Sequence, residues 1–240
     1  MSSAYPALDP IGIVHSPFKE KFGIPRQPGL IPSVPGAIEL LPPYAHVDAV
    51  RGLDGFSHIW VLFLLHAVPE THMKLTARPP RLGGNTRIGV FASRTTHRPN
   101  RIGQSVVRLD AIESTPEGVR LRISGHDLLD RTPVLDIKPY LPYADIVIDA
   151  SSAYANAAPL DVLEVEWTAE AARLAAEANQ DAGWDLRGVI DAMLRLDPRP
   201  AYRAEQADAS EYGMRVDRYD VRFEARANRV RVLTLRRDPD

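Results

Sequence analysis

The feature that most constrains the fold is a series of short apolar or alternating segments in the first 150 residues, separated by Pro and Gly. Alternation and β-branched residues predict strands. No long segment with helical spacing lies between them, which argues against a doubly wound parallel sheet. We therefore expect a mainly β fold, a barrel or a sandwich, over residues 1–150. The segments span residues 11–15, 37–41, 59–65, 86–92, 105–112, 118–124 and 133–137.

The pattern changes after a small, polar stretch at 149–159, which is typical of a linker or a long surface loop. Residues 162–167 alternate as a strand, and Thr168 has the character of an N-cap before an Ala- and Glu-rich helix. A second helix is predicted over 186–196. Strands are predicted over 216–224 and 229–235. We expect a small α+β unit over residues 160–240.

Cysteine is absent, which excludes disulfides, zinc–thiolate sites, iron–sulfur clusters and a Cys nucleophile. The N-terminus has no basic segment followed by an apolar one, as a signal peptide would. The most apolar run, residues 59–67, is about half of the roughly 20 residues that a membrane-spanning helix needs. We expect a cytoplasmic protein without a membrane segment.

The formal net charge of −2 conceals a strongly basic block. Residues 71–109 contain no Asp or Glu and eight cationic side chains, so the rest of the chain sums to −10. Such segregation can present a basic face to a polyanion such as RNA. The alternative is that these arginines pair with acids elsewhere, such as Asp127, Asp130 and Asp136. The cations are Lys74, Arg78, Arg81, Arg87, Arg94, Arg98, Arg101 and Arg108.

Several residues carry candidate chemistry, each with a simpler structural explanation. Asp127, Asp130 and Asp136 have the side chains of a divalent metal site, yet turn aspartates are common for local hydrogen-bonding reasons. Asp136 and Lys138 are two apart, which places them on one face of a strand, either as a buried pair or as a ligand site. His66 ends an apolar strand, where histidines more often belong to the core. The loop at 25–29 is polar and fixed by proline, as an ordinary connector is.

The common nucleotide and hydrolase motifs are missing. The chain has no GxxxxGK[ST] phosphate loop, no GxGxxG fingerprint and no GxSxG elbow. A Rossmann-type cofactor site is therefore not expected.

The same segments carry a family resemblance. Five motifs in order resemble the tRNA N6-adenosine methyltransferases with a TsaA-like (YaeB-like) β-barrel domain, the TrmO family, over nearly the whole chain. The motifs are IGIVHSPFKEKFGIPRQPGL (11–30), AVRGLDGFSHIWVLFLLH (49–66), RPPRLGGNTRIGVFASRTTHRPNRIGQSVV (78–107), DLLDRTPVLDIKPYLPYAD (127–145) and DPRPAY (197–202).

The resemblance implies an N-terminal TsaA-like β-barrel domain and methyl transfer from S-adenosylmethionine. The acceptor would be N6 of threonylcarbamoyl-adenosine, 3′ of the tRNA anticodon. It also implies a homodimer with the cofactor site near the subunit interface. The cofactor contacts carried over by motif are Pro25, Arg26, Gln27, His66, Ala67, Arg94, Asp136, Ile137, Lys138 and Pro139.

The charges of the cofactor suggest roles for these residues. Asp136 is the candidate for a cationic part of the cofactor, and Arg26 or Arg94 for its carboxylate. Backbone groups around His66, Ala67 and Ile137 are candidates for framing the adenine. No general base is assigned; Asp136 and His97 are the alternatives.

For the tRNA, we expect the anticodon stem-loop to lie on the basic block. Expected RNA contacts are Arg78, Arg81, Arg98, Arg101 and Tyr140. Tyr140 is a candidate platform on which a base stacks, and Tyr143 is a second one. Arg199 and Tyr202 are further candidates for stem-loop contact.

Two positions depart from the family pattern. Arg101 stands where the family usually has Pro, and Arg131 where it usually has Gly. If position 131 requires a positive φ, the arginine is strained there.

Two rival functions remain open at this point. One is an RNA-binding barrel without catalysis, and the other is a metal-dependent hydrolase that uses Asp127, Asp130 and Asp136.

Overall fold

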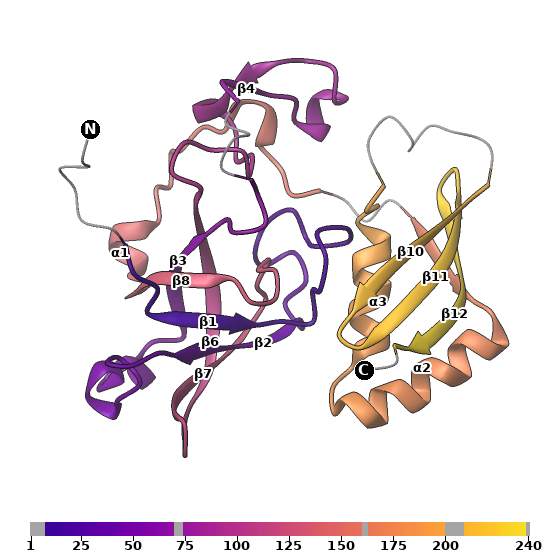
Figure 1. The fold of residues 1–240 in the computed structure, drawn as a ribbon. Coiled ribbons are helices and arrows are strands. Elements are labelled where there is room, and N and C mark those ends of the chain that lie inside the picture. Colours follow the sequence, from indigo (N-terminus) through magenta and orange to yellow (C-terminus); the bar gives the residue numbers. More distant parts are fainter. Residues whose placement is uncertain (1–7, 70–73, 160–162, 200–208, 239–240) are drawn as a thin grey trace.

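Six antiparallel strands close into a barrel in the first half of the chain (Figure 1). The computed structural model describes residues 8–69, 74–159, 163–199 and 209–238. The strand order is β1-β2-β7-β6-β3-β8. The expected mainly β fold is confirmed, as a barrel rather than a sandwich. The strands are β1 (Gly12–His15), β2 (Pro35–Leu40), β3 (His58–Leu64), β6 (Ile102–Thr115), β7 (Gly118–Ser124) and β8 (Pro133–Pro139).

The barrel interior is filled by alternate residues of its strands, as the sequence pattern predicts. In β3, Ile59, Val61 and Phe63 are buried, and in β7 Val119, Leu121 and Ile123 are buried. Successive side chains of a strand point to opposite faces, so one apolar set fills the interior.

A small lobe projects beyond the end of β3 (Figure 1). It contains the short pair β4 (Thr76–Ala77) and β5 (Ile88–Gly89), and 3-10 turns at Pro80–Leu82 and Val90–Ala92. The expected strand over 86–92 is wrong beyond Gly89. Val90 N donates to Leu75 O, which is the last contact of this strand pair. The chain then turns, and the turn is closed by Ser93 N and Ser93 Oγ, which both donate to Val90 O.

The second half forms a four-stranded sheet with two helices packed on it. Thr168 caps α2 through its side chain, as predicted, and Asp185 caps α3. The expected strand over 216–224 is wrong at its start, because Asp217, at φ 54°, lies in a tight turn between two strands. The elements are β9 (Glu164–Trp167), α2 (Ala169–Ala182), α3 (Leu186–Arg195), β10 (Ser210–Val216), β11 (Tyr219–Arg226) and β12 (Arg229–Arg237), in sheet order β10-β11-β12-β9.

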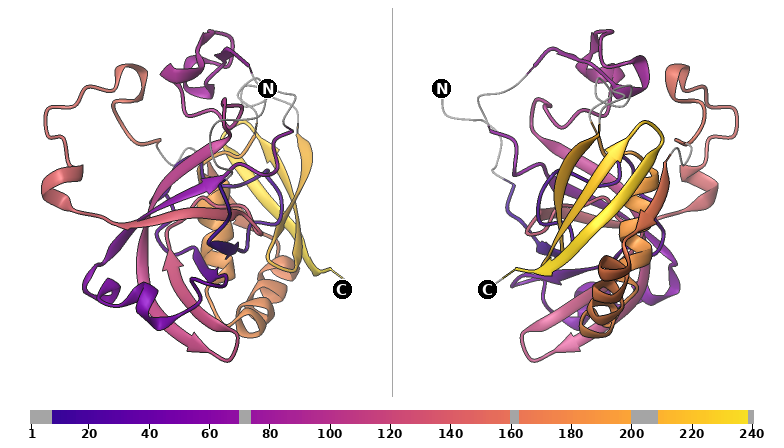
Figure 2. Two further views of the ribbon diagram at one scale, coloured as in Figure 1. Left: turned by 60° about the vertical axis from the view of Figure 1, so that its left-hand side comes forward. Right: turned by 90° about the vertical axis from the view of Figure 1, so that its right-hand side faces the viewer.

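The segment that follows β8 in sequence and leads to the second half forms a long arm, which arches away from the barrel (Figure 2). It contains α1 (Pro142–Asp145) and a 3-10 turn at Ala153–Ala155. Two hydrogen bonds return it to the lobe: Arg81 Nη1 donates to Ala157 O at 2.6 Å, and Tyr154 Oη donates to Ala92 O at 3.2 Å.

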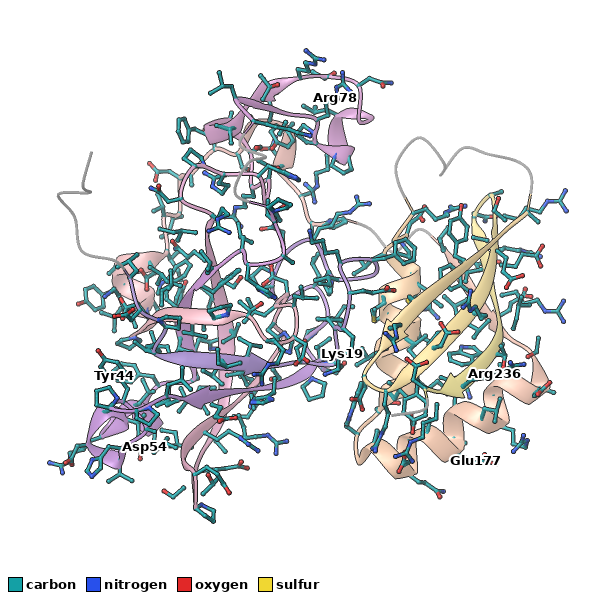
Figure 3. All side chains as sticks on the ribbon, viewed as in Figure 1. Lys19, Tyr44, Asp54, Arg78, Glu177 and Arg236 are labelled. Carbon is teal, nitrogen blue, oxygen red and sulfur yellow. The ribbon has the colours of Figure 1, made fainter. Side chains whose placement is uncertain are left out.

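The segment from Ser16 to Val34 joins the two halves. Phe18, Ile31 and Val34 belong to the core of the second half rather than to the barrel core. Phe18 forms a β-bridge with Val216, and Asp217 N donates to Pro17 O at 2.6 Å. Lys19 lies at this junction (Figure 3). Within the described ranges, no helix is both long and apolar enough to cross a membrane.

Candidate functional site

The loop of Pro25, Arg26 and Gln27 lies within the joining segment. Pro25 is buried, whereas Arg26 is exposed and Gln27 half-buried. Arg26 Nη2 donates to Asp197 O at 3.4 Å, so the loop touches the second half of the molecule. Gln27 Oε1 accepts a hydrogen bond from Arg94 Nη1. The structure therefore brings together Gln27 and Arg94, which are 67 residues apart in sequence.

The charge of Arg94 also acts on Asp127, which is hydrogen-bonded to buried Ser105. Ser105 Oγ donates to Asp127 Oδ1 at 2.6 Å, and Ser105 is 2% exposed. Burial raises the pKa of Asp127 above its ordinary value, while the Ser105 hydrogen bond and the charge of Arg94 act in the opposite direction. Arg94 is thus hydrogen-bonded to the Gln27 amide, and its charge acts on the Asp127 carboxyl group.

His66 and Ala67 follow the end of β3, on the side of the barrel that faces the joining segment. Lys21 Nζ donates to Ala67 O, and His66 Nδ1 lies 3.5 Å from Thr132 Oγ1. Burial lowers the pKa of His66 below its ordinary value, so this imidazole is neutral at pH 7.

The remaining predicted cofactor residues lie on β8. A register shift opposite Leu62 and Phe63 makes a bulge in β8, so that Asp136 pairs with Leu62 while Val134 pairs with Phe63. Asp136 and Lys138 form an ion pair of 2.8 Å, which confirms that they share a face. The pair is substantially exposed rather than buried.

Ile137 and Pro139 point to the other side of β8. They line a cavity of about 340 Å³ at the end of the barrel where β3 begins. Tyr44, Leu53 and Phe56 line the same cavity, which is therefore largely apolar.

The predicted cofactor residues thus form two groups in one chain. The first contains Pro25, Arg26, Gln27, His66, Ala67 and Arg94, and the second contains Asp136 to Pro139. No hydrogen bond or ion pair within the described residues joins the two groups.

The predicted RNA contacts are also distributed unevenly. Arg78 and Arg81 are exposed on the lobe, and Figure 3 shows Arg78 at its outer end. Arg98 is half-buried, and its Nη1 donates to Ser93 O at 2.7 Å and Val90 O at 3.3 Å. Tyr140 lies at the opposite end of β3, where its backbone N donates to His58 O and its ring packs against Trp60.

The backbone is unusual at both departures from the family pattern. Arg131 has φ 64°, so the left-handed conformation that glycine adopts without strain is present there. Arg101 has φ 52°, which a proline ring cannot reach. The turn at 101 therefore differs from any turn that carries proline at this position. Arg101 Nη1 donates to Val68 O at 3.4 Å.

The two candidates for stem-loop contact in the second half are Arg199 and Tyr202. Arg199 is 3% exposed and forms a bidentate pair with Asp197, at 2.7 and 2.8 Å. It also donates to Ala227 O at 2.9 Å, so it braces this half instead of facing a ligand. Tyr202 lies outside the described residues.

The three aspartates considered for a metal site point to different partners. Asp127 accepts from Ser105, Asp130 pairs with Lys19 at 2.9 Å, and Asp136 pairs with Lys138. In the part of the chain that the structure describes, no three His, Asp or Glu side chains are grouped to hold a metal ion.

Sequence reasoning missed the role of Ser105. Its signal was present, because Ser105 shares the parity of Val107 and Leu109, which are buried in β6. A hydroxyl at an interior strand position needs a partner, and here that partner is Asp127.

Comparison with known proteins covers both halves of the chain. The profile of the tRNA-methyltransferase O N-terminal domain matches residues 13–146, and that of the TrmO C-terminal domain matches residues 161–238. A Pseudomonas aeruginosa protein named as an S-adenosylmethionine-dependent methyltransferase, RcsF, is 50% identical over 95% of this chain and 97% of its own length.

Two further relatives agree with these matches. The tRNA (adenine(37)-N6)-methyltransferase of Escherichia coli is 46% identical over 90% of this chain and 92% of its own length. The crystal structure of TrmO from Pseudomonas aeruginosa superposes with a TM-score of 0.78 at 43% identity, covering 97% of this chain and 99% of that one.

Proposed function

The chain belongs to the tRNA-methyltransferase O family, and on this basis we propose that it methylates N6 of the adenosine at position 37 of tRNA. S-adenosylmethionine is the methyl donor, and threonylcarbamoyl-adenosine is the proposed acceptor. The observation that carries the proposal is the position of Arg94, whose guanidinium donates to Gln27 and whose charge acts on Asp127, beside a lobe without Asp or Glu.

The side chains present fit the donor. Its carboxylate requires a cation, which Arg26 and Arg94 offer, and its cationic groups require an anion such as Asp136. The exposed Asp136–Lys138 pair is weak, because solvent screens it, so a cationic ligand can replace Lys138.

When bound, S-adenosylmethionine would supply a methyl group on a cationic sulfur. The N6 nitrogen of the acceptor would take this methyl group in line, with the neutral thioether as leaving group and loss of the N6 proton to water. The protein then has to hold the two reactants in register, and such positioning contributes about 7–11 kcal/mol in favourable cases. The hydrogen bond of Arg94 to Gln27 serves this purpose, because a guanidinium with a settled partner loses less freedom when a ligand binds.

We also propose that the protein is a homodimer in the cytoplasm. Apolar side chains directly after β8 support the dimer: Tyr143 is 88% exposed, Val147 64% and Ile148 95%. Exposed apolar runs of this kind mark interaction surfaces. Sedimentation of the full chain as a monomer at micromolar concentration would contradict the dimer.

The activity is tested with labelled S-adenosylmethionine and tRNA from a strain that lacks the modification. Digestion and mass spectrometry should identify N6-methylated threonylcarbamoyl-adenosine. A product at another base, or no product, would refute the proposal.

The cofactor residues are tested by calorimetry. Arg94→Ala and Asp136→Asn should each weaken S-adenosylmethionine binding by about tenfold or more, since each removes a charge-assisted contact. The matched control is Arg236→Ala, an exposed arginine of β12 (Figure 3), which should leave the affinity unchanged. Native affinity in Arg94→Ala and Asp136→Asn would refute the site.

A further inference from the structure

One aromatic ring in the basic lobe is displayed to solvent. Phe91 is 80% exposed, although its neighbour Val90 is only 3% exposed. Leaving a phenyl ring in water forfeits the roughly 1.5–3 kcal/mol that its burial would contribute. An exposed Phe in an ordered turn therefore calls for an explanation.

The turn that carries Phe91 is braced from several directions. Arg98 Nη1 donates to both Ser93 O and Val90 O, and Ser93 Oγ donates to Val90 O at 3.0 Å. From the arm, Tyr154 Oη donates to Ala92 O. These bonds fix the backbone on both sides of the ring, so Phe91 is held outward before any partner arrives.

The surroundings of the ring favour an anionic partner. Residues 74–98 carry Lys74, five arginines and no Asp or Glu. Arg87 is exposed and lies four residues before Phe91, and Arg78 and Arg81 are exposed in the same lobe. Arginines around a protruding aromatic ring are what unpaired RNA bases require, with guanidinium groups for phosphates and a ring for stacking.

A protein partner suits this surface less well. Stable protein interfaces bury at least about 1,000 Å² and have few charged residues at their centre. In this lobe, by contrast, cationic side chains surround a single aromatic ring, that of Phe91.

We propose that Phe91 is a stacking platform for an unpaired base of the substrate's anticodon loop, with the neighbouring arginines binding the adjacent phosphates. This assignment rests on the proposed function, since it names how the same substrate is held. It assigns the aromatic contact beside the basic lobe to Phe91 and not to Tyr140, because Tyr140 lies at the far end of β3.

The test measures binding of a labelled anticodon stem-loop RNA to the full chain by fluorescence anisotropy, without methyl transfer. Phe91→Ala and Phe91→Leu should each raise Kd about tenfold, since both remove the π face. Phe91→Trp should bind at least as tightly as the native chain. The matched control is Leu75→Ala, because Leu75 is 76% exposed in the same lobe but has no π face, and its Kd should not change.

Salt dependence separates stacking from phosphate binding. The slope of log Kd against log salt should be unchanged in Phe91→Ala and should fall by about one in Arg87→Ala. Each variant is also titrated with S-adenosylmethionine, and its affinity should match that of the native chain.

Native RNA affinity in Phe91→Leu would overturn the inference, because an aliphatic side chain would then suffice. A loss of dimer in Phe91→Ala, seen by sedimentation with unchanged RNA affinity, would overturn it too and assign the ring to a second copy of the chain. A native chain that binds the stem-loop through Phe91 but transfers no methyl group would refute the proposed function alone.

Discussion

The two hydrophobic cores of the molecule are built in different ways. The barrel core is assembled from residues between Ile11 and Ile137, all within the first half. The core of the second half takes Phe18, Ile31 and Val34 from the first half, in addition to its own helices and sheet. The barrel is thus complete from its own sequence, and the second half is not.

The difference bears on the site, because the borrowed residues flank Pro25, Arg26 and Gln27. The predicted cofactor loop is anchored in the core of the second half, and Arg26 touches Asp197 there. The second half therefore helps to set the position of Gln27 and Arg94, although its own described residues include none of the predicted cofactor contacts.

The largest expected effect comes from removing the main borrowed side chain. Phe18 is 1% exposed, and Phe18→Ala should lower the free energy of unfolding by about 4 kcal/mol. Chemical denaturation measures this, followed by fluorescence of Trp167 and Trp184 in the second half. The control is Phe91→Ala, at 80% exposure, which should change stability by less than about 0.5 kcal/mol. Equal small effects of both variants would show that the second core stands without the joining segment.

A somewhat smaller effect is expected at the contact between the second half and the loop. Arg199→Ala leaves the Asp197 carboxylate without its bidentate partner, which should cost about 3 kcal/mol of stability. Because Asp197 O accepts from Arg26, the same variant should weaken S-adenosylmethionine binding, which Arg195→Ala, an exposed neighbour, should not do. Loss of stability with native cofactor affinity would show that the second half does not position the loop.

The barrel could be predicted from the sequence because alternation records burial directly, residue by residue. The cluster around Arg94 was only partly predictable. The family resemblance indicated Gln27 and Arg94 separately, but their contact depends on how the joining segment crosses the barrel. Phe18 shows the limit well, since its apolar side chain gives no sign of which core receives it. The 3-10 turn at Phe91 was hidden by the apparent alternation of residues 86–92, because the side chain of Arg98 donates hydrogen bonds to the backbone carbonyls of Val90 and Ser93 there.

The last comparison concerns the histidine at the boundary of the two cores. His126 is 1% exposed, its Nε2 donates to Pro35 O at 3.0 Å, and its Nδ1 accepts from Leu128 N. Its ring meets the edge of Phe18 at 5.6 Å, and Gly36 makes room for it, since a Cβ there would lie 2.4 Å from Nε2. Burial lowers the pKa of His126 to about 4.

In the unfolded chain the same imidazole binds a proton near its ordinary pKa of about 6.5, so acid favours unfolding. The contribution of His126 to the free energy of unfolding is fully present above about pH 6.5 and is lost as the pH falls towards 4. Between pH 7 and pH 5 the loss should be about 2 kcal/mol. Denaturation of the native chain and of His126→Gln across this range isolates the contribution, because only the variant should lack this part of the slope. His46→Gln, an exposed histidine, should keep it. If the free energy of unfolding of the native chain and of His126→Gln changed identically with pH, His126 would take up its proton without opening of the junction. The two cores would then be less tightly coupled through Phe18 than their contact indicates.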